Sequence, residues 1–585
     1  MNRQKTEVRN IAVVGAGIVG VPMAAMLADP GVNGDAPADC RVMVIQRNSP
    51  TSGWKVEAIN NGKSPIGGIE PELDRIVAEA RARGRLAASH DYADLRDADV
   101  ILICVQTDKK GFGPDYGPLE DAVNRIAESL KKRRSGKIPL VIFESTLAPT
   151  SMATWVTDHF RQHGFFDGRN ILLGNSPNRV MPGRLVERIR ESDKAVGGLN
   201  PLTPKLIGSL YSRIVKNGKL HLTNSLTAEL VKTLENSYRD VRIAYSAEIA
   251  RACEERDIDY YRVREEVNQR LAWSDQASTA LSAVPTGGLL IPTVGVGGHC
   301  LPKDGILLLW RQIESGSDMS ASLILEARRI NDESPSVTLS LIERHFGDLA
   351  GKSIALMGTA YRSNSEDTRN SPTLVLAALL LKKGSKVTLH DPYVKQNDQN
   401  LMRSRLTRHF TGDLDRVLGK AEILVFCAAH RVYHEDLGLI LRAAPRLKHI
   451  FDGCNLFSQT GIPVTGVSLK GFGKGRGKPP GGFLAYACQG FRTMEKGFAN
   501  EIESFIRFAN ERYAQDKFNR ADFKRVKAIA ETCVTGCRVA DPGPVEGPAA
   551  WGGFSSRLVQ KAVQAGSTEK GLTKTGRQNR KNPKT

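Results

Sequence analysis

The feature that most constrains the fold is a motif of three spaced glycines, Gly15-Ala-Gly17-Ile-Val-Gly20. It lies between two apolar segments, residues 11–14 and 21–27. In a strand–turn–helix context the first glycine makes the turn, the second lets a pyrophosphate approach, and the third lets helix and strand pack. We therefore predict a dinucleotide-binding βα unit, with a tight turn that binds no ligand as the alternative. The predicted cofactor contacts in this unit are Gly15, Gly17, Ile18, Val19 and Gly20.

The next predicted strand, residues 41–45, is followed by Gln46 and Arg47. An Asp or Glu at this place binds the ribose hydroxyls of NAD, whereas a nearby arginine accepts the 2′-phosphate of NADP. A glutamine can still form a hydrogen bond with a ribose hydroxyl. We therefore predict NAD as the cofactor, in contact with Gln46 and Arg47, and keep NADP as the alternative.

Strand and helix signals alternate along most of the chain, which predicts an α/β fold. Short apolar runs such as residues 100–105 and 140–143 are typical of buried parallel strands, and a second series of such runs begins near residue 351. Between them, residues 224–256 have a 3.6-residue apolar period and neither Gly nor Pro. We predict two Rossmann-like doubly wound domains, joined by this long central helix and a helical domain. The predicted domains are a cofactor-binding domain at 1–202, a central helical domain at 203–330, a second Rossmann-like domain at 331–477 and an extension at 478–585.

Composition limits the partners and the compartment. The formal net charge of +19 favours anionic partners, nucleotides among them. Nine scattered cysteines, without a CxxC pair or zinc-ligand spacing, favour a reducing cytoplasm and predict no metal site. The apolar segment 11–27 is shorter than the roughly 20 residues of a membrane-spanning helix, and we predict no membrane span.

The extension changes character along its length. Residues 471–482 are rich in glycine and read as a linker, and residues 494–535 read as helical. The end, from about Gly566, is polar and basic with few apolar side chains, so we predict a disordered tail. We favour a solvated tail over one that contacts nucleic acid, anionic lipid or another enzyme.

A second glycine-rich segment, residues 294–304, reads Val-Gly-Val-Gly-Gly-His-Cys-Leu-Pro-Lys-Asp. Its glycines let the backbone turn tightly and approach a ligand. Cys300 follows them at once, and Lys303 and Asp304 lie within one turn, which suits a thiolate nucleophile. The alternative is a surface turn with an inert cysteine. A base for Cys300 would have to face it, and adjacent residues rarely face each other. We therefore expect His299 to pack against its neighbours or to contact a substrate.

The long central segment carries Glu229, Lys232 and Asn236, whose spacings of three and four place them on one helix face. Facing a nicotinamide, a lysine and an amide one turn apart can deprotonate an alcohol and orient it. An ordinary surface ion pair between Glu229 and Lys232 is the alternative. The same helix is a candidate dimer seam, so we predict a homodimer or a higher homo-oligomer.

Five motifs follow one another within residues 8–477, about four-fifths of the chain. In their order along the chain they are Gly15-x-Gly17-x-x-Gly20, Glu144-Ser-Thr146, Glu229-x-x-Lys232-x-x-x-Asn236, Gly297-Gly-His-Cys300-x-Pro-Lys-Asp304 and Asp367-Thr-Arg369-x-Ser371-Pro372. With this series the chain resembles the UDP-glucose/GDP-mannose dehydrogenase family of nucleotide-sugar 6-dehydrogenases. The patterns Arg-Val-x-Pro-Gly and His-Cys-x-Pro further resemble bacterial members that act on UDP-N-acetylhexosamines.

The resemblance implies that two NAD⁺ oxidise a sugar C6 alcohol to a carboxylate, through a thiohemiacetal and then a thioester on Cys300. It implies that Lys232, aided by Asn236, stabilises the oxyanion and that Asp304, with a water, assists proton transfer. The implied catalytic residues are Cys300, Lys232, Asn236, Asp304 and Thr146, the last near the nicotinamide. The implied cofactor contacts beyond the glycine run are Gln46, Arg47, Thr107 and Thr146. The implied substrate contacts are Asn178, Arg179, Lys232, Asn236, Gly297, Arg362 and Arg369.

The sequence departs from the family pattern at four places. Asn178 stands where the family has the glutamate thought to assist thioester hydrolysis, and an amide cannot act as a carboxylate base. Gln46 replaces the ribose-binding acid, residues 106–108 replace a Pro-Thr-Pro-like turn, and the extension has no counterpart in the family core. Two alternatives for hydrolysis stay open: Asn178 orients the water while another group takes the proton, or the step is slow or altered.

Two other functions compete with the 6-dehydrogenase. A two-electron hydroxyacid dehydrogenase can share the dinucleotide domain and the Lys-x-x-x-Asn helix, but Cys300 and the second α/β domain argue against it. A non-catalytic or impaired nucleotide-sugar-binding protein is suggested by Asn178 and by the extension. We predict an NAD-dependent UDP-sugar 6-dehydrogenase of the kind used in polysaccharide biosynthesis.

Overall fold

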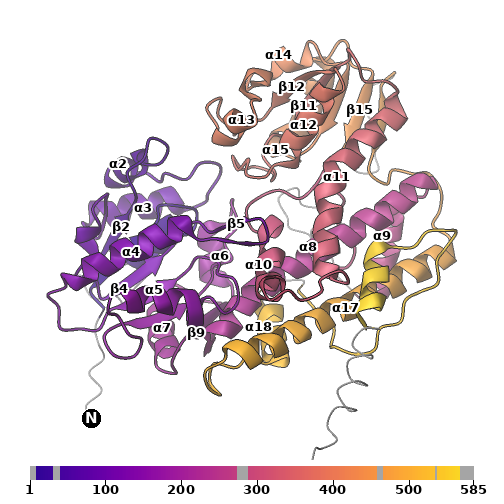
Figure 1. Ribbon diagram of the computed structural model, residues 1–585. Helices are drawn as coiled ribbons and strands as arrows, with labels where there is room; N and C mark the ends of the chain where they lie inside the picture. Colours follow the sequence, from indigo (N-terminus) through magenta and orange to yellow (C-terminus); the bar gives the residue numbers. More distant parts are fainter. Residues whose placement is uncertain (1–7, 30–39, 273–286, 458–465, 534–536, 567–585) are drawn as a thin grey trace, which may run out of the picture. The chain divides into compact units, whose positions relative to one another are not determined.

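The computed structural model describes residues 8–29, 40–272, 287–457, 466–533 and 537–566 (Figure 1). The chain divides into two compact units. Unit 1 comprises Met1–Glu235 with Leu307–Gly316 and Phe505–Thr535, and unit 2 comprises Asn236–Ile306, Ser317–Ser504 and Gly536–Thr585. The tail predicted to be disordered, beyond residue 566, lies outside the described residues.

Unit 1 contains an eight-stranded sheet in the order β10-β9-β8-β7-β4-β1-β2-β3. Every neighbouring pair is parallel except β8 and β9. The strands are β1 Asn10–Val14, β2 Arg41–Ile45, β3 Leu86–Ser89, β4 Val100–Ile103, β7 Leu140–Phe143, β8 Leu172–Asn175, β9 Lys194–Gly198 and β10 Leu220–Asn224. The helices of this region are α1 Gly20–Ala28, α2 Trp54–Asn60, α3 Leu73–Ala82, α4 Gly117–Lys131, α5 Thr157–Gln162, α6 Leu185–Glu191 and α7 Thr203–Tyr211. A hairpin of β5 (Asp108–Lys110) and β6 (Gly113–Asp115) follows β4.

Both faces of this sheet are buried, which explains the continuous apolar runs of its central strands. Successive β1 residues alternate between the two faces: Ile11 and Val13 belong to one hydrophobic cluster, and Ala12 and Val14 belong to the other. The central order β3-β2-β1-β4 is that of a doubly wound dinucleotide-binding sheet. The predicted α/β class and the first Rossmann-like sheet are therefore confirmed.

The sheet of unit 1 continues beyond residue 202. Helix α7 and strand β10 follow, and β10 pairs in parallel with β9 at the sheet edge. The sequence signal there reads as helical from residue 203, because β10 is only five residues long and its first three residues are partly exposed or exposed. An edge strand needs few apolar side chains, so the apolar pattern gives little sign of it.

Unit 2 contains a six-stranded, fully parallel sheet in the order β13-β12-β11-β14-β15-β16 (Figure 1). Its strands are β11 Ser353–Met357, β12 Lys386–His390, β13 Phe410–Thr411, β14 Ile423–Phe426, β15 His449–Asp452 and β16 Ser468–Gly471. The helices beside them are α12 Pro372–Lys382, α13 Gln399–Arg403, α14 Leu414–Leu418, α15 Arg431–Glu435 and α16 Leu437–Arg442. This order confirms the second predicted Rossmann-like sheet.

Long helices make up the rest of the described fold. Helix α8 spans Ser225–Glu255, within one residue of the predicted bounds. The other long helices are α9 Tyr260–Arg270, α10 Leu301–Glu314, α11 Leu323–Phe346, α17 Gly481–Tyr513 and α18 Phe523–Cys533. Helix α17 thus begins inside the predicted linker and well before the predicted helical stretch. No helix of the described residues combines the length and apolar character needed to cross a bilayer.

Candidate functional site

The glycine turn after β1 has the geometry expected of a pyrophosphate site. Gly15 has φ +108°, and a Cβ there would lie 2.7 Å from the carbonyl oxygen of Cys104. A Cβ at Gly20 would lie 1.9 Å from the carbonyl oxygen of Gly15, so turn and helix touch at this residue. A Cβ at Gly17 would meet no atom within 4 Å, which leaves open space beside α1's N-terminal turn. These residues fit a dinucleotide, because a helix N-terminus favours the negative charge of its pyrophosphate.

Gln46, which follows β2, is tied to this turn. Its Oε1 accepts a hydrogen bond from the Ala16 amide at 2.8 Å, and its Nε2 donates to Ser52 Oγ at 3.0 Å. Lys55 Nζ also donates to the Ala16 carbonyl, at 3.0 Å. Arg47 lies beside Gln46 and is exposed. The side chain at the predicted ribose position therefore supports the glycine turn directly.

The carboxyl ends of β4 and β7 bring Thr107 and Thr146 together. Thr107 Oγ1 donates to the Thr146 carbonyl oxygen at 2.7 Å. Ser145 Oγ, next to Thr146, donates to the Val105 carbonyl at 2.6 Å. Both predicted threonines therefore lie at the sheet edge where open α/β sheets bind their ligands.

A buried carboxylate, Glu144, lies under Asn178. Lys194 Nζ donates to Glu144 Oε2 at 2.8 Å, Asn178 Nδ2 donates to the same oxygen at 3.1 Å, and the Tyr211 hydroxyl donates to Oε1. Burial lowers the pKa of Lys194, an effect that Glu144 opposes. Burial and then Glu144 raise the pKa of Cys104 well above its ordinary value, which leaves this thiol protonated and unsuited to attack.

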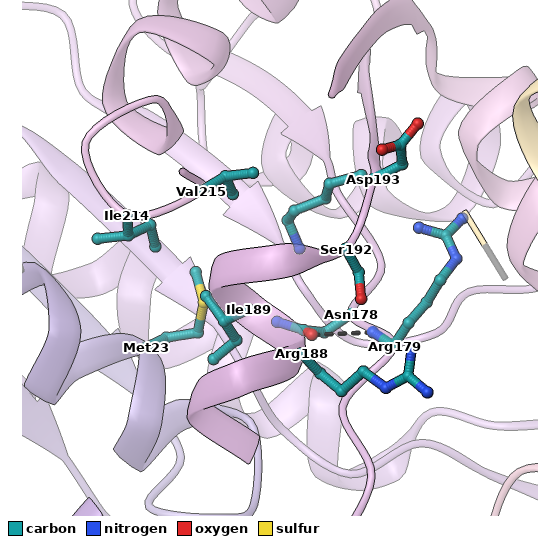
Figure 2. A pocket seen from close by; sticks show the side chains of 10 residues that line it. Met23, Asn178, Arg179, Arg188, Ile189, Ser192, Asp193, Ile214 and Val215 are labelled. Atoms are coloured by element: carbon teal, nitrogen blue, oxygen red, sulfur yellow. Dashed lines mark hydrogen bonds between the residues drawn. The ribbon is translucent and has the colours of Figure 1, made fainter. Parts of the chain in front are cut away.

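Asn178 and Arg179 line a pocket together with Met23, Arg188 and Ser192 (Figure 2). The Arg179 backbone N–H donates to Asn178 Oδ1 at 2.8 Å, the contact dashed in Figure 2. The Asn178 side chain therefore donates to Glu144 through its nitrogen and accepts from the Arg179 backbone through its oxygen. The Arg179 guanidinium pairs at 2.6 Å with Glu235, and both side chains are buried.

The first half of α8 carries Glu229 and Lys232 in unit 1. Glu229 is buried and accepts the amides of Thr150 at 2.8 Å and Met152 at 2.9 Å. Burial raises the pKa of Glu229 to about 8. Lys232 is buried as well, with 6% of its surface exposed, so this helix face is not the solvated ion pair of the alternative interpretation.

Unit 2 holds Cys300 together with Asn236 and Asp304. Asp304 is fully buried: its Oδ2 accepts from Asn236 Nδ2 at 2.5 Å and its Oδ1 from Lys303 Nζ at 2.6 Å. Cys300 precedes the first residue of α10, and its carbonyl accepts the Asp304 amide at 2.9 Å. All nine cysteines lie among the described residues, and Cys300 is the exposed one. The thiol that the sequence singles out is therefore accessible.

The Cys300 loop packs against the segment that carries Arg362 and Arg369, also in unit 2. The Gly298 amide donates to the Arg369 carbonyl at 2.8 Å, and Asn370 Nδ2 donates to the Gly298 carbonyl at 2.9 Å. A Cβ at Gly297 would lie 2.4 Å from the Cβ of Tyr361, so only glycine fits there. Arg369 forms a two-point ion pair with Asp367 and is partly exposed.

Sequence reasoning missed the partners that hold these residues. Glu144 is named in a motif but carries no predicted role, and Lys194 and Tyr211 are absent from the prediction. They lie 50 and 67 residues from Glu144 along the chain, so no local spacing links them. Among the described residues, no three His, Cys, Asp or Glu side chains gather as a metal centre would require.

Three models of one family match the chain in succession. The NAD-binding domain of the UDP-glucose/GDP-mannose dehydrogenase family matches residues 9–215, its central domain 226–333 and its UDP-binding domain 355–459. Together these matches include every strand of the first sheet except β10, every strand of the second except β16, and helices α8, α9 and α10.

Relatives and solved structures agree with these matches. The UDP-N-acetyl-D-mannosamine dehydrogenase of Pyrococcus horikoshii is 31% identical over 469 residues, 80% of this chain and 99% of that protein. A solved UDP-D-ManNAc dehydrogenase structure from the same organism, with 31% identity, covers 80% of this chain and 99% of its own, with a TM-score of 0.65. The NDP-N-acetyl-D-galactosaminuronic acid dehydrogenase structure from Methanosarcina mazei Go1 is 29% identical and covers 81% and 97%, with a TM-score of 0.63.

Proposed function

The chain belongs to the UDP-glucose/GDP-mannose dehydrogenase family, and we propose that it oxidises the C6 alcohol of a UDP-N-acetylhexosamine to a carboxylate. The family identity and the NAD-binding domain make the chain an NAD-dependent oxidoreductase with a nucleotide-sugar substrate. The narrower sugar class rests on the names of the relatives, which act on N-acetylated hexosamines.

In the first oxidation the chain orients the alcohol and removes its proton. When bound, NAD⁺ supplies the hydride acceptor, held by the glycine turn, Gln46, Thr107 and Thr146. Lys232 takes or polarises the hydroxyl proton, and Asn236 orients the oxygen. Hydride loss from C6 with loss of this proton gives the aldehyde.

In the second oxidation Cys300 becomes the nucleophile. Its thiolate adds to the aldehyde carbon and forms a thiohemiacetal, whose oxyanion Lys232 stabilises. Loss of a second hydride from C6, for which a second NAD⁺ would be the acceptor, removes the oxyanion's negative charge and leaves a thioester on Cys300. The observation that carries this step is the exposure of Cys300 on a glycine loop, in the same unit as the hydrogen-bonded pair of Asn236 and Asp304.

Hydrolysis of the thioester needs a water and a group that takes its proton. We propose that Asp304, held by Lys303 and Asn236, takes the proton, while Asn178 orients the water. Water adds to the thioester carbon, the C–S bond breaks, and the thiol of Cys300 is regenerated with the carboxylate product.

Arg362 and Arg369, with the backbone at Gly297, are proposed to hold the nucleotide end of the substrate. The positions of these residues around the Cys300 loop support this role, as does the match of residues 355–459 to a UDP-binding domain. An arginine suits a diphosphate, because its planar fork donates two parallel hydrogen bonds.

The test is the yield of NADH per UDP-N-acetylhexosamine consumed, measured with UDP-N-acetylmannosamine, UDP-N-acetylgalactosamine and UDP-glucose. Complete oxidation predicts two NADH for each sugar acid formed. One NADH with free aldehyde would contradict the cysteine mechanism, and an absence of turnover with every sugar would favour the non-catalytic binding protein.

Replacing the nucleophile separates the two oxidations. For Cys300→Ser we expect the formation of sugar acid to fall by at least about a thousandfold, because serine lacks a thiolate. The matched control is Cys488→Ser, which removes a buried thiol on α17 and should retain activity. Sugar acid formed by Cys300→Ser at the normal rate would remove Cys300 from the mechanism.

A further inference from the structure

We propose that the C-terminal extension takes the place of a second subunit on α8, so that the protein is a monomer. The sequence predicts α8 as a dimer seam. In the structure, the chain's own residues 481–533 and 537–566 lie along this helix within each unit. This inference is independent of the proposed reaction.

Helix α8 has little free surface within the described chain. No residue from Ser225 to Glu254 is exposed. The partly exposed ones follow one narrow line, which includes Asn236, Arg239, Ile243 and Arg251. A stable dimer seam needs a broad apolar face that is free in the monomer, and this line is narrow and carries two arginines.

Within unit 2, α17 runs antiparallel to α8. Tyr238 of α8 packs against Phe498, with ring centroids 5.3 Å apart, and Tyr245 packs against Phe491 at 6.0 Å. The Tyr245 hydroxyl donates to the Ala487 carbonyl at 2.9 Å. Two tyrosines seven residues apart on α8 thus contact two phenylalanines seven residues apart on α17. This is the spacing of two helices that pack along their length.

The two helices also match in length. Helix α8 has 31 residues and α17 has 33, so each is about 45–50 Å long. Within unit 1, Asn224, just before α8, donates its side-chain amide to the carbonyls of Phe518 at 2.6 Å and Arg520 at 2.8 Å. The extension therefore reaches the start of α8.

The last part of the extension covers the end of α8. In unit 2 the buried carboxylate of Glu248 accepts from Ser556 Oγ and from the Arg557 amide, both at 2.7 Å. Arg557 in turn pairs with Glu326 and Glu333 of α11. A buried acid held by two residues of the extension favours a permanent contact, because loss of these partners would leave its buried oxygens without hydrogen bonds.

The relatives point the same way. The Pyrococcus horikoshii enzyme is matched over 99% of its length yet accounts for 80% of this chain, and the last family model ends at residue 459. The cover on α8, residues 481–533 and 537–566, is therefore built from a segment that lies beyond all three family models.

The first test is the mass of the intact chain in solution, by light scattering after size exclusion, over a hundredfold range of concentration. We expect the mass of one chain, 63.9 kDa, at every concentration. A particle of twice this mass, whether a dimer through α8 or an exchange of α17 between two chains, would overturn the proposal.

The second test checks in solution that α17 lies on α8. A Cβ at Gly490 would lie 2.4 Å from the Tyr245 hydroxyl oxygen, so Gly490→Ala should speed amide exchange in α8 by about tenfold. In the Tyr245→Phe background, which lacks this oxygen, the same substitution should have a much smaller effect. Gln489→Ala, at the exposed neighbouring position, is the control. Equal effects of Gly490→Ala in both backgrounds would show that the helices are not in contact.

Discussion

Asn178 shares its surroundings with a carboxylate, and this decides what a substitution there can do. Its side-chain amide donates to Glu144, which also binds Lys194 and Tyr211. The amide at this position is neutral, so it places no second charge beside Glu144 and Lys194. A glutamate at 178 would add a second negative charge about 3 Å from the first, which disfavours ionisation of the pair.

For Asn178→Glu we expect thioester hydrolysis to become about ten to a hundred times faster, and the gain to appear only as pH rises. The new carboxylate is a base that the amide cannot be. Its pKa is raised by repulsion from the Glu144 carboxylate, so it acts as a base only at higher pH. The measurement is single-turnover release of sugar acid between pH 6 and 9, with Asn178→Gln as the control. A glutamate variant no faster than the glutamine variant at any pH would mean that residue 178 does not act in hydrolysis.

Two alanine substitutions in the glycine turn should have different effects, one on NAD⁺ binding and the other on stability. Gly17→Ala places its methyl group in open space, so the fold should be kept while NAD⁺ binds at least about tenfold more weakly. Gly20→Ala drives its methyl group into the Gly15 carbonyl and should cost ~1–3 kcal/mol of stability. Thermal unfolding and NAD⁺ titration distinguish the two. Unchanged NAD⁺ affinity in Gly17→Ala would place the pyrophosphate elsewhere.

At the scale of elements, α11 begins at a cap supplied by the extension. Glu501 of α17 accepts from Ser322 Oγ and from the amides of Leu323 and Ile324, at the first turn of α11. Burial raises the pKa of Glu501 to about 7 from its ordinary 4.5. The folded chain therefore keeps a proton that the unfolded chain releases, and the free energy of unfolding falls as pH rises from about 4.5 to about 7.

Glu501→Gln should remove this dependence, because its amide can donate to Ser322 while its oxygen accepts the two backbone amides. We expect the variant to be more stable than the native chain by ~1–3 kcal/mol at pH 8 and to differ little at pH 4.5. Urea unfolding at the two pH values measures the difference, with the exposed Glu511→Gln as control. The same gain at both pH values would show that the effect is not the titration of Glu501.

The elements that sequence predicts well are those with a complete apolar signal of their own. Strands β2, β4 and β7 and helix α8 match their predicted positions, because each is buried on two sides or carries a long period. Edge strand β10 is not predicted, because it is short and three of its five residues are partly exposed or exposed. The site divides in the same way: Cys300, Asp304 and Asn236 carry local motifs, whereas Lys194 and Tyr211 reach Glu144 only through the folded sheet.

For the whole molecule, net charge predicts how salt affects the reaction. The chain carries +19 formal charges and its nucleotide-sugar substrate is an anion. We expect KM for the nucleotide sugar to rise several-fold between about 20 and 300 mM KCl, while kcat changes little, because salt screens long-range attraction and leaves the chemical step. Steady-state kinetics at five salt concentrations measure this. A KM independent of salt would show that the excess charge lies away from the substrate's path.

The cover of α8 by its own chain has a consequence for heredity. If every working molecule is one polypeptide, a defective copy cannot enter an assembly with a sound one and spoil it. A cell that expresses equal amounts of native and Cys300→Ser protein should then keep half of its activity, and the mutant allele should behave as recessive. An enzyme whose copies complete each other would lose more than half, and the defect would be dominant.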